Sequence, residues 1–113
     1  MHELSITQDM LDLVLEQAEQ AEAKKVGRIN LVIGEMTGIV EECVRFYFGF
    51  VSEGTPAEGA DLHIKKVASE ARCRGCGKSF EIDEFDWTCP HCESKEVEIT
   101  AGKELFVESI EVE

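Results

Sequence analysis

The chain has 113 residues, of which 43% are hydrophobic, so it can bury the core of one domain and carry at most a small additional module. Its 24 acidic residues outnumber its 11 basic residues and give a formal net charge of −13. This charge argues against nucleic acid and anionic membranes as partners, and it favours basic or cationic ligands. The N-terminal region lacks the features of a signal peptide and no apolar run could span a bilayer, so we expect a cytoplasmic protein.

The first residues, Met1-His2-Glu3, place an amine, a peptide nitrogen and an imidazole within one residue of each other. Three neighbouring nitrogen donors suit square-planar Ni(II) or Cu(II). So short a motif is weak evidence by itself, because the ends of most domains are loosely ordered and bind nothing. It needs support from the rest of the sequence.

Residues 5–25 are predicted to form an amphipathic helix. Ser5 and Gln8 have the spacing of a capping box, which marks a helix start. Lys24 and Lys25 suit the negatively polarised end of a helix. The apolar side chains that recur at helical spacing are Leu11, Val14, Leu15, Ala18 and Ala21.

The middle of the chain continues with alternating strand and helix patterns. Residues 28–34 show the period-2 alternation of a strand with one buried face. Residues 40–52 predict a second helix, and residues 61–67 predict another strand. The inward stripe of the second helix should consist of Val40, Val44, Tyr47, Phe48 and Val51.

Two further strand-like segments lie near the C-terminus, at 95–100 and 104–113, and residues 101–103 between them predict a hairpin turn. The order of the elements predicts an α+β fold, in which two helices pack on a small mixed sheet. We expect its core to contain Leu11, Val14, Leu15, Ile29, Leu31, Ile33, Val44, Phe48, Leu62 and Ile64.

Four of the five cysteines form two C-x-x-C pairs that interrupt the strand-rich half of the chain. Two such pairs, separated here by twelve residues, are typical of a closed tetrahedral site, for which zinc is the usual ion. The stretch between the pairs has few bulky residues, so we expect the module to depend on the metal for folding. The predicted ligands of this structural zinc are Cys73, Cys76, Cys89 and Cys92.

Two other chemistries use C-x-x-C pairs. A redox dithiol needs only one pair. A rubredoxin-like iron site uses the same four ligands, and the sequence does not distinguish it from a zinc site. His91 lies between two of the cysteines and is a candidate alternative ligand, although a solvent-facing side chain is the simpler interpretation. Cys43 is expected to be a small buried residue and His63 an exposed one.

No catalytic constellation is visible in the sequence, neither a Ser-His-Asp set nor a phosphate-binding glycine loop. We therefore expect a binding protein and not an enzyme. Three roles fit this expectation: a metal carrier, a zinc-ribbon interaction module that has no role in nickel binding, or a rubredoxin-like electron carrier.

The motifs together resemble the HypA family of hydrogenase maturation factors, which are nickel metallochaperones. The resemblance runs from MHELSIT through VIGEMTGIVEECVRFYF, EGTPAEGADLHI, CRGCGKSF and CPHC to AGKELFVESIEVE, and so covers essentially the whole chain. It implies an α+β nickel-binding domain, formed by residues 1–68 and 98–113. It also implies an inserted zinc-ribbon-like domain with a four-cysteine site, residues 69–97.

The resemblance gives the N-terminal motif a role. It implies that the His2 imidazole and the backbone nitrogens of His2 and Glu3 bind nickel, with Met1 in the terminal position. Some relatives place a further Asp near the nickel, in the loop before the second helix. Val40 stands there in this chain, so we assign no loop carboxylate.

The implied function is delivery of Ni(II) to the large subunit of a [NiFe]-hydrogenase, while the zinc is structural and stays bound. The implied partners are this large subunit, the GTPase HypB and, in some organisms, the urease maturation proteins.

Overall fold

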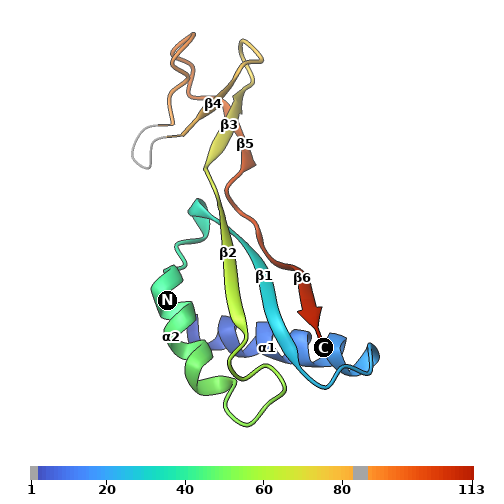
Figure 1. The fold of residues 1–113 in the computed structure, drawn as a ribbon. Helices are drawn as coiled ribbons and strands as arrows, with labels where there is room; N and C mark the ends of the chain where they lie inside the picture. The colour runs from blue at the N-terminus through green and yellow to red at the C-terminus, as the bar shows by residue number, and fades with distance from the viewer. Residues whose placement is uncertain (1–2, 83–86) are drawn as a thin grey trace.

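A computed structural model of the chain describes residues 3–82 and 87–113, so the predicted ligands Met1 and His2 lie outside the described residues. The molecule is elongated, with extents of 54 × 26 × 17 Å, because its two small sheets lie end to end (Figure 1). The elements in chain order are α1 (Glu3–Gln20), β1 (Val26–Gly34), the 3-10 helix η1 (Glu35–Thr37), α2 (Glu41–Val51), β2 (Asp61–Val67), β3 (Glu70–Cys73), β4 (Ser79–Glu81), β5 (Val97–Ala101) and β6 (Leu105–Val112).

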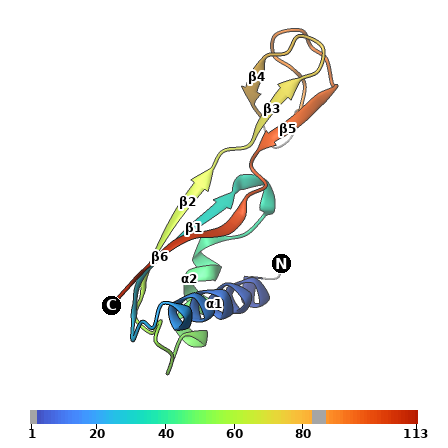
Figure 2. The ribbon, with the colours of Figure 1, turned by 90° about the vertical axis from the view of Figure 1, so that its right-hand side faces the viewer.

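The larger body is built on a three-stranded mixed sheet of order β2-β1-β6. The central strand β1 pairs in parallel with β2 and antiparallel with β6. Both helices lie on one side of this sheet (Figure 2). The α+β class and the mixed sheet predicted from the sequence are therefore confirmed.

The core lies between this sheet and the two helices. Eight of the ten predicted core residues are buried, and the other two, Leu15 and Ile64, are partly buried against them. Periodicity located the core correctly because a helix or a strand that buries one face must repeat its apolar residues at its own structural period. The eight buried residues are Leu11, Val14, Ile29, Leu31, Ile33, Val44, Phe48 and Leu62.

Both predicted ends of α1 are wrong, because the helix ends at Gln20 and the two lysines at 24 and 25 lie beyond it. The helix already begins at Glu3, so Ser5 and Gln8 lie within its first turns and form no capping box. Gln8 instead donates from Nε2 to Asp12 one turn later, at 2.9 Å. The inward stripe of α2 is also partly wrong, because Val40 precedes the helix and is 46% exposed.

The predicted C-terminal hairpin is wrong as well. β5 pairs with β3 in the upper sheet of order β4-β3-β5, whereas β6 pairs with β1 in the larger sheet. The chain therefore passes from one sheet to the other at Gly102, which adopts a φ of +113° that favours glycine. A strand pattern marks a strand but does not say which partner the strand takes, and β3 was not foreseen at all.

Two connections, β2 to β3 and β5 to β6, join the sheets at a narrow junction that we call the neck (residues 34–36, 69 and 102–104). The amide of Met36 donates to the Gly102 carbonyl at 2.7 Å, and the amide of Ser69 donates to the Glu35 carboxylate at 3.2 Å. A Cβ at Gly34 would overlap the Gly102 carbonyl, so the two backbones touch without side chains between them.

Candidate metal sites

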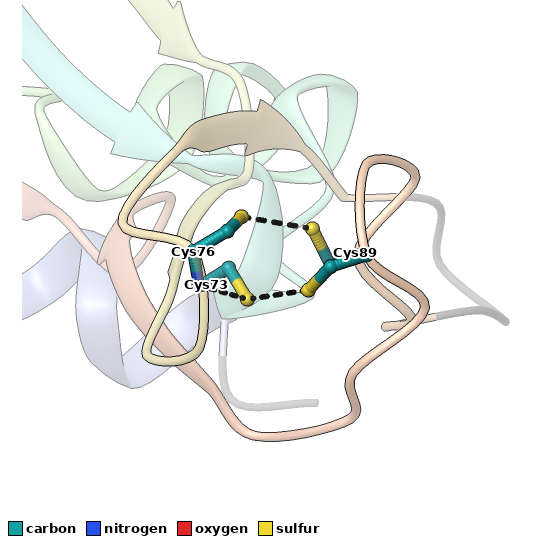
Figure 3. Close-up of side chains that lie close together, drawn as sticks. Cys73, Cys76 and Cys89 are labelled. Atoms are coloured by element: carbon teal, nitrogen blue, oxygen red, sulfur yellow. Dashed lines mark hydrogen bonds between the residues drawn. The ribbon is translucent and has the colours of Figure 1, made fainter.

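The upper module brings the four predicted zinc ligands together. Cys73 ends β3, Cys76 follows in the next turn, and the second pair lies in the loop before β5. All four sulfur atoms lie within 4.8 Å of one another. Figure 3 shows the side chains of Cys73 and Cys76 directed towards that of Cys89.

The sulfur separations match a tetrahedral metal site. The Sγ atoms of Cys73 and Cys92 are 3.4 Å apart, and those of Cys76 and Cys89 are 3.7 Å apart. Zinc bound at about 2.3 Å by four thiolates requires sulfur–sulfur distances of about 3.8 Å. Four converging sulfur donors are also the set that zinc prefers in closed structural sites, so the cluster fits a structural zinc ion.

Backbone amides around the sulfurs favour the charged thiolate form. The amides of Cys76 and Gly75 donate to Cys73 Sγ at 3.5 and 3.3 Å, and the amide of His91 donates to Cys89 Sγ at 3.4 Å. The Cys76 amide makes the largest contribution to lowering the pKa of the Cys73 thiol to about 6. The turn that follows a C-x-x-C pair thus orients the donors that stabilise its first thiolate.

The fourth thiol behaves differently. The Ser94 amide lowers the pKa of Cys92, but the neighbouring thiols, Cys73 first, and desolvation outweigh it and raise this pKa to about 12. Sulfurs this close do not all ionise, because adjacent thiolates repel one another. A bound dication removes this repulsion, which is a further reason why the donor set fits a metal ion.

The remaining candidate ligands lie elsewhere. Within the described part of the chain, His91 does not belong to the cluster of converging ligand atoms, and its side chain is exposed. His63 lies on β2 and is exposed, as the sequence indicated. Cys43, expected to be buried, is only half-buried on the first turn of α2.

Of the predicted nickel segment, only Glu3 belongs to the described residues. Its side chain is 6% exposed, and its carboxylate accepts a hydrogen bond from the Val40 amide at 3.3 Å. Because Glu3 lies in the first turn of α1 and Val40 precedes the first turn of α2, the carboxylate lies at the positively polarised ends of two helices. Its own amide and the Val40 amide hold the pKa of the Glu3 carboxyl below its usual range.

The contact between Glu3 and Val40 was not foreseen. The two residues are 37 positions apart, and Val40 has no side chain that could cap α2. The Glu3 carboxylate supplies this acceptor from another helix. No local sequence signal could have revealed the contact, because it depends on the way α1 and α2 pack.

The chain matches known proteins along its whole length. Residues 1–112 match the family model described as hydrogenase/urease nickel incorporation, metallochaperone, HypA. The chain is 47% identical to hydrogenase maturation factor HypA of Dehalococcoides mccartyi over all of this chain and 95% of the relative. It is 48% identical to HypA of Caldanaerobacter subterraneus and 41% identical to hydrogenase maturation factor HybF of Escherichia coli K12, in both cases over the full length of both chains.

Solved structures of similar proteins have the same fold. The solution structure of the Ni metallochaperone HypA from Helicobacter pylori matches with a TM-score of 0.67 and 31% identity, over 99% of this chain and 97% of that one. Another HypA solution structure matches with a TM-score of 0.74 and 30% identity, over 99% and 96% of the two chains. From the match along its whole length, we conclude that the chain belongs to the HypA family of hydrogenase/urease nickel-incorporation metallochaperones.

Proposed function

We propose that this chain binds Ni(II) reversibly at Met1-His2-Glu3 and delivers it to the large subunit of a [NiFe]-hydrogenase, and in some organisms to urease. The observation that carries the proposal is the His2 motif within a chain that matches a nickel-incorporation family along residues 1–112. The partners are the hydrogenase large subunit, a HypB-type GTPase and, in those organisms, urease maturation proteins; the protein acts in the cytoplasm.

In the proposed site, the His2 imidazole and the backbone nitrogens of His2 and Glu3 bind the metal. These donors suit square-planar Ni(II), and the imidazole anchors the metal while a peptide nitrogen loses its proton. A site with few side-chain ligands releases its metal more readily than a closed cage does, which is what delivery requires. The Glu3 carboxylate is already hydrogen-bonded to Val40, so its role in this scheme is to anchor the segment to α2.

We also propose that Cys73, Cys76, Cys89 and Cys92 hold one zinc ion that is structural and is not transferred. The convergence of the four sulfurs and the amide donors around them support this assignment.

The test of the nickel site compares two of the three histidines of the chain. His2→Ala should abolish specific Ni(II) binding in a calorimetric titration at neutral pH and leave the zinc content unchanged. His63→Ala is the matched control, because this histidine is exposed on β2, and it should bind Ni(II) like the parent. If His2→Ala binds Ni(II) as tightly as the parent and still supports hydrogenase maturation in cells, the proposed site is wrong.

A further inference from the structure

The four-cysteine cluster is enclosed on one side and open to solvent on the other. Cys73 and Cys89, the first cysteine of each C-x-x-C pair, are buried, whereas Cys76 and Cys92, the second of each pair, are exposed. All four sulfurs nevertheless lie within 4.8 Å of one another. A reagent that reaches an exposed cysteine therefore meets a sulfur that has a buried sulfur as its close neighbour.

Gly75 leaves space beside two of these sulfurs. A Cβ at this position would lie 3.7 Å from Cys92 Sγ and 3.5 Å from Cys73 Sγ, which are ordinary contact distances. The backbone of Gly75 has no positive φ, so its conformation does not require glycine. The missing side chain thus leaves the approach to Cys92 open by about the width of one methyl group, where an alanine would cover it without a clash.

The Cys92 sulfur has a partner placed to form a disulfide. Cys73 Sγ lies 3.4 Å away, closer than the 3.7 Å between the sulfurs of Cys76 and Cys89. A disulfide bond of about 2.05 Å requires only a small further approach. It would join the two C-x-x-C pairs and remove two of the four donors, so the remaining two thiols could not form the closed four-coordinate site that zinc prefers.

We propose that the cluster is a redox switch, in which a peroxide oxidises Cys92 and Cys73 to a disulfide and the upper module loses its zinc. The net charge of −13 repels anionic oxidants and favours a small neutral one such as hydrogen peroxide. Solvent exposure and thiolate character are the two properties that make a cysteine susceptible, and zinc coordination keeps the exposed sulfur in the thiolate form.

The reaction takes place in two steps. The Cys92 thiolate attacks one oxygen of the peroxide, the O–O bond breaks, and the products are a Cys92 sulfenic acid and hydroxide. The Cys73 thiolate then attacks the Cys92 sulfur, forms the S–S bond and displaces a second hydroxide. Each sulfur loses one electron, the peroxide gains two, and both hydroxides take a proton from the solvent. A dithiol reductant reverses the oxidation by thiol–disulfide exchange.

The switch acts on the upper module and leaves the larger body unchanged. Cys73 ends β3, the strand that pairs with both β4 and β5, so loss of the zinc removes the tie at the end of the central strand of this sheet. The inference rests on the zinc assignment proposed above and does not depend on the nickel site.

The experiment follows zinc release from the full chain, with Cys43→Ser in every sample so that the fifth cysteine does not react. Hydrogen peroxide should release one equivalent of zinc per chain to a chromophoric chelator, and a dithiol with added zinc should restore the bound metal. Gly75→Ala should keep its zinc and release it at least about threefold more slowly, because the methyl group covers Cys92 Sγ. Gly49→Ala on α2, where a Cβ would contact nothing within 4 Å, is the matched control and should react like the parent.

Mass spectrometry identifies the sulfurs that react. Limited alkylation of the zinc-loaded protein with iodoacetamide should modify Cys76 and Cys92 before Cys73 and Cys89, and the oxidised protein should contain a disulfide between Cys73 and Cys92. The redox proposal is overturned if alkylation begins at the two buried cysteines or if the disulfide forms within one C-x-x-C pair.

Two further outcomes of the zinc measurement count against the proposal. Zinc that stays bound in peroxide, or equal release rates for Gly75→Ala and Gly49→Ala, would overturn the redox switch and leave the zinc assignment standing. Purified protein that binds no zinc before oxidation would overturn the zinc assignment and the switch together.

Discussion

At the scale of single residues, Glu3 shows how one side chain serves two helices. Its carboxylate is nearly fully buried at the ends of α1 and α2, and it satisfies an amide that Val40 cannot cap itself. A negative charge at the start of a helix is stabilised by the helix dipole. We therefore expect this residue to matter for stability even before any metal is considered.

Replacement of Glu3 by Ala should lower the melting temperature, because it leaves the Val40 amide without its acceptor. Glu3→Gln keeps an acceptor for the Val40 amide and should lower the melting temperature less. Glu16→Ala, at an exposed position of the same helix, is the control and should have little effect. Thermal unfolding followed by circular dichroism without nickel measures this, and equal melting temperatures for Glu3→Ala and Glu16→Ala would contradict it.

The lowered pKa of Glu3 also makes the stability of the fold depend on pH. The folded state prefers the ionised carboxylate, so its stabilising effect is complete above the ordinary glutamate pKa and is lost as the pH falls through the lowered value. The difference in melting temperature between the parent and Glu3→Gln should therefore shrink on acidification. If the difference in melting temperature instead grew as the pH fell, the ionised Glu3 carboxylate would not be the stabilising form.

Cys73 gives a second prediction for pH. Above about pH 6 its thiol is already ionised, so zinc does not have to displace a proton from it; below that pH each binding event must also release this proton. The zinc affinity should therefore fall more steeply once the pH drops below about 6. Competition with a chromophoric chelator across this range measures the slope, and a slope that stays constant through the range would contradict the assignment.

At the scale of elements, the neck depends on two backbones in direct contact. Gly34 ends β1 and Gly102 separates β5 from β6, and a side chain at Gly34 would overlap the Gly102 carbonyl. Gly34→Ala should therefore reduce the free energy of unfolding by at least about 2 kcal/mol, because the strands must shift to accept one methyl group. Chemical denaturation measures the change.

Gly27 provides the control on the same strand. A Cβ there would lie 3.8 Å from its nearest neighbour, the Glu111 carbonyl, which is an ordinary contact. Gly27→Ala should therefore leave the stability close to that of the parent. Equal effects of the two alanine substitutions would show that the neck tolerates a side chain.

At the scale of the whole molecule, the two bodies differ in what holds them together. The hydrophobic core cluster of the described residues lies entirely in the larger body, between Met10 and Leu62, with Val107 and Ile110 packed against it. Among the described residues of the upper module, those that are buried are small, such as Ala71, Cys73 and Cys89. A module without an apolar core needs the metal to offset the entropy that folding costs.

Removal of zinc by a chelator should therefore unfold the upper module and leave the larger body folded. The helical circular dichroism should be retained, because both α-helices lie in the larger body, while the fluorescence of Trp87, the single tryptophan, should change. Cys76→Ser should lose zinc and reproduce this state, whereas Cys43→Ser on α2 should keep a full equivalent of zinc. Loss of helical signal together with zinc would refute independent folding of the two bodies.

The sequence alone determined the features that depend on short-range spacing. The two C-x-x-C pairs predicted the converging sulfurs, since a knuckle of four residues fixes the positions of its own thiols. Helical and strand periods located the core, and their order indicated the α+β class. The resemblance to the HypA family was confirmed along the whole chain.

Only the tertiary structure decided which segments meet across long separations. It placed β5 and β6 in different sheets. The sequence could not decide this, because a strand pattern carries no information about its pairing partner. It brought Glu3 into contact with Val40, and Gly34 into contact with Gly102. These contacts depend on how the helices and strands pack together, and not on the neighbouring residues in the sequence. It also left Phe46 and Phe50 exposed, because periodicity shows that a helix has an apolar face but not how much of its circumference the rest of the fold covers.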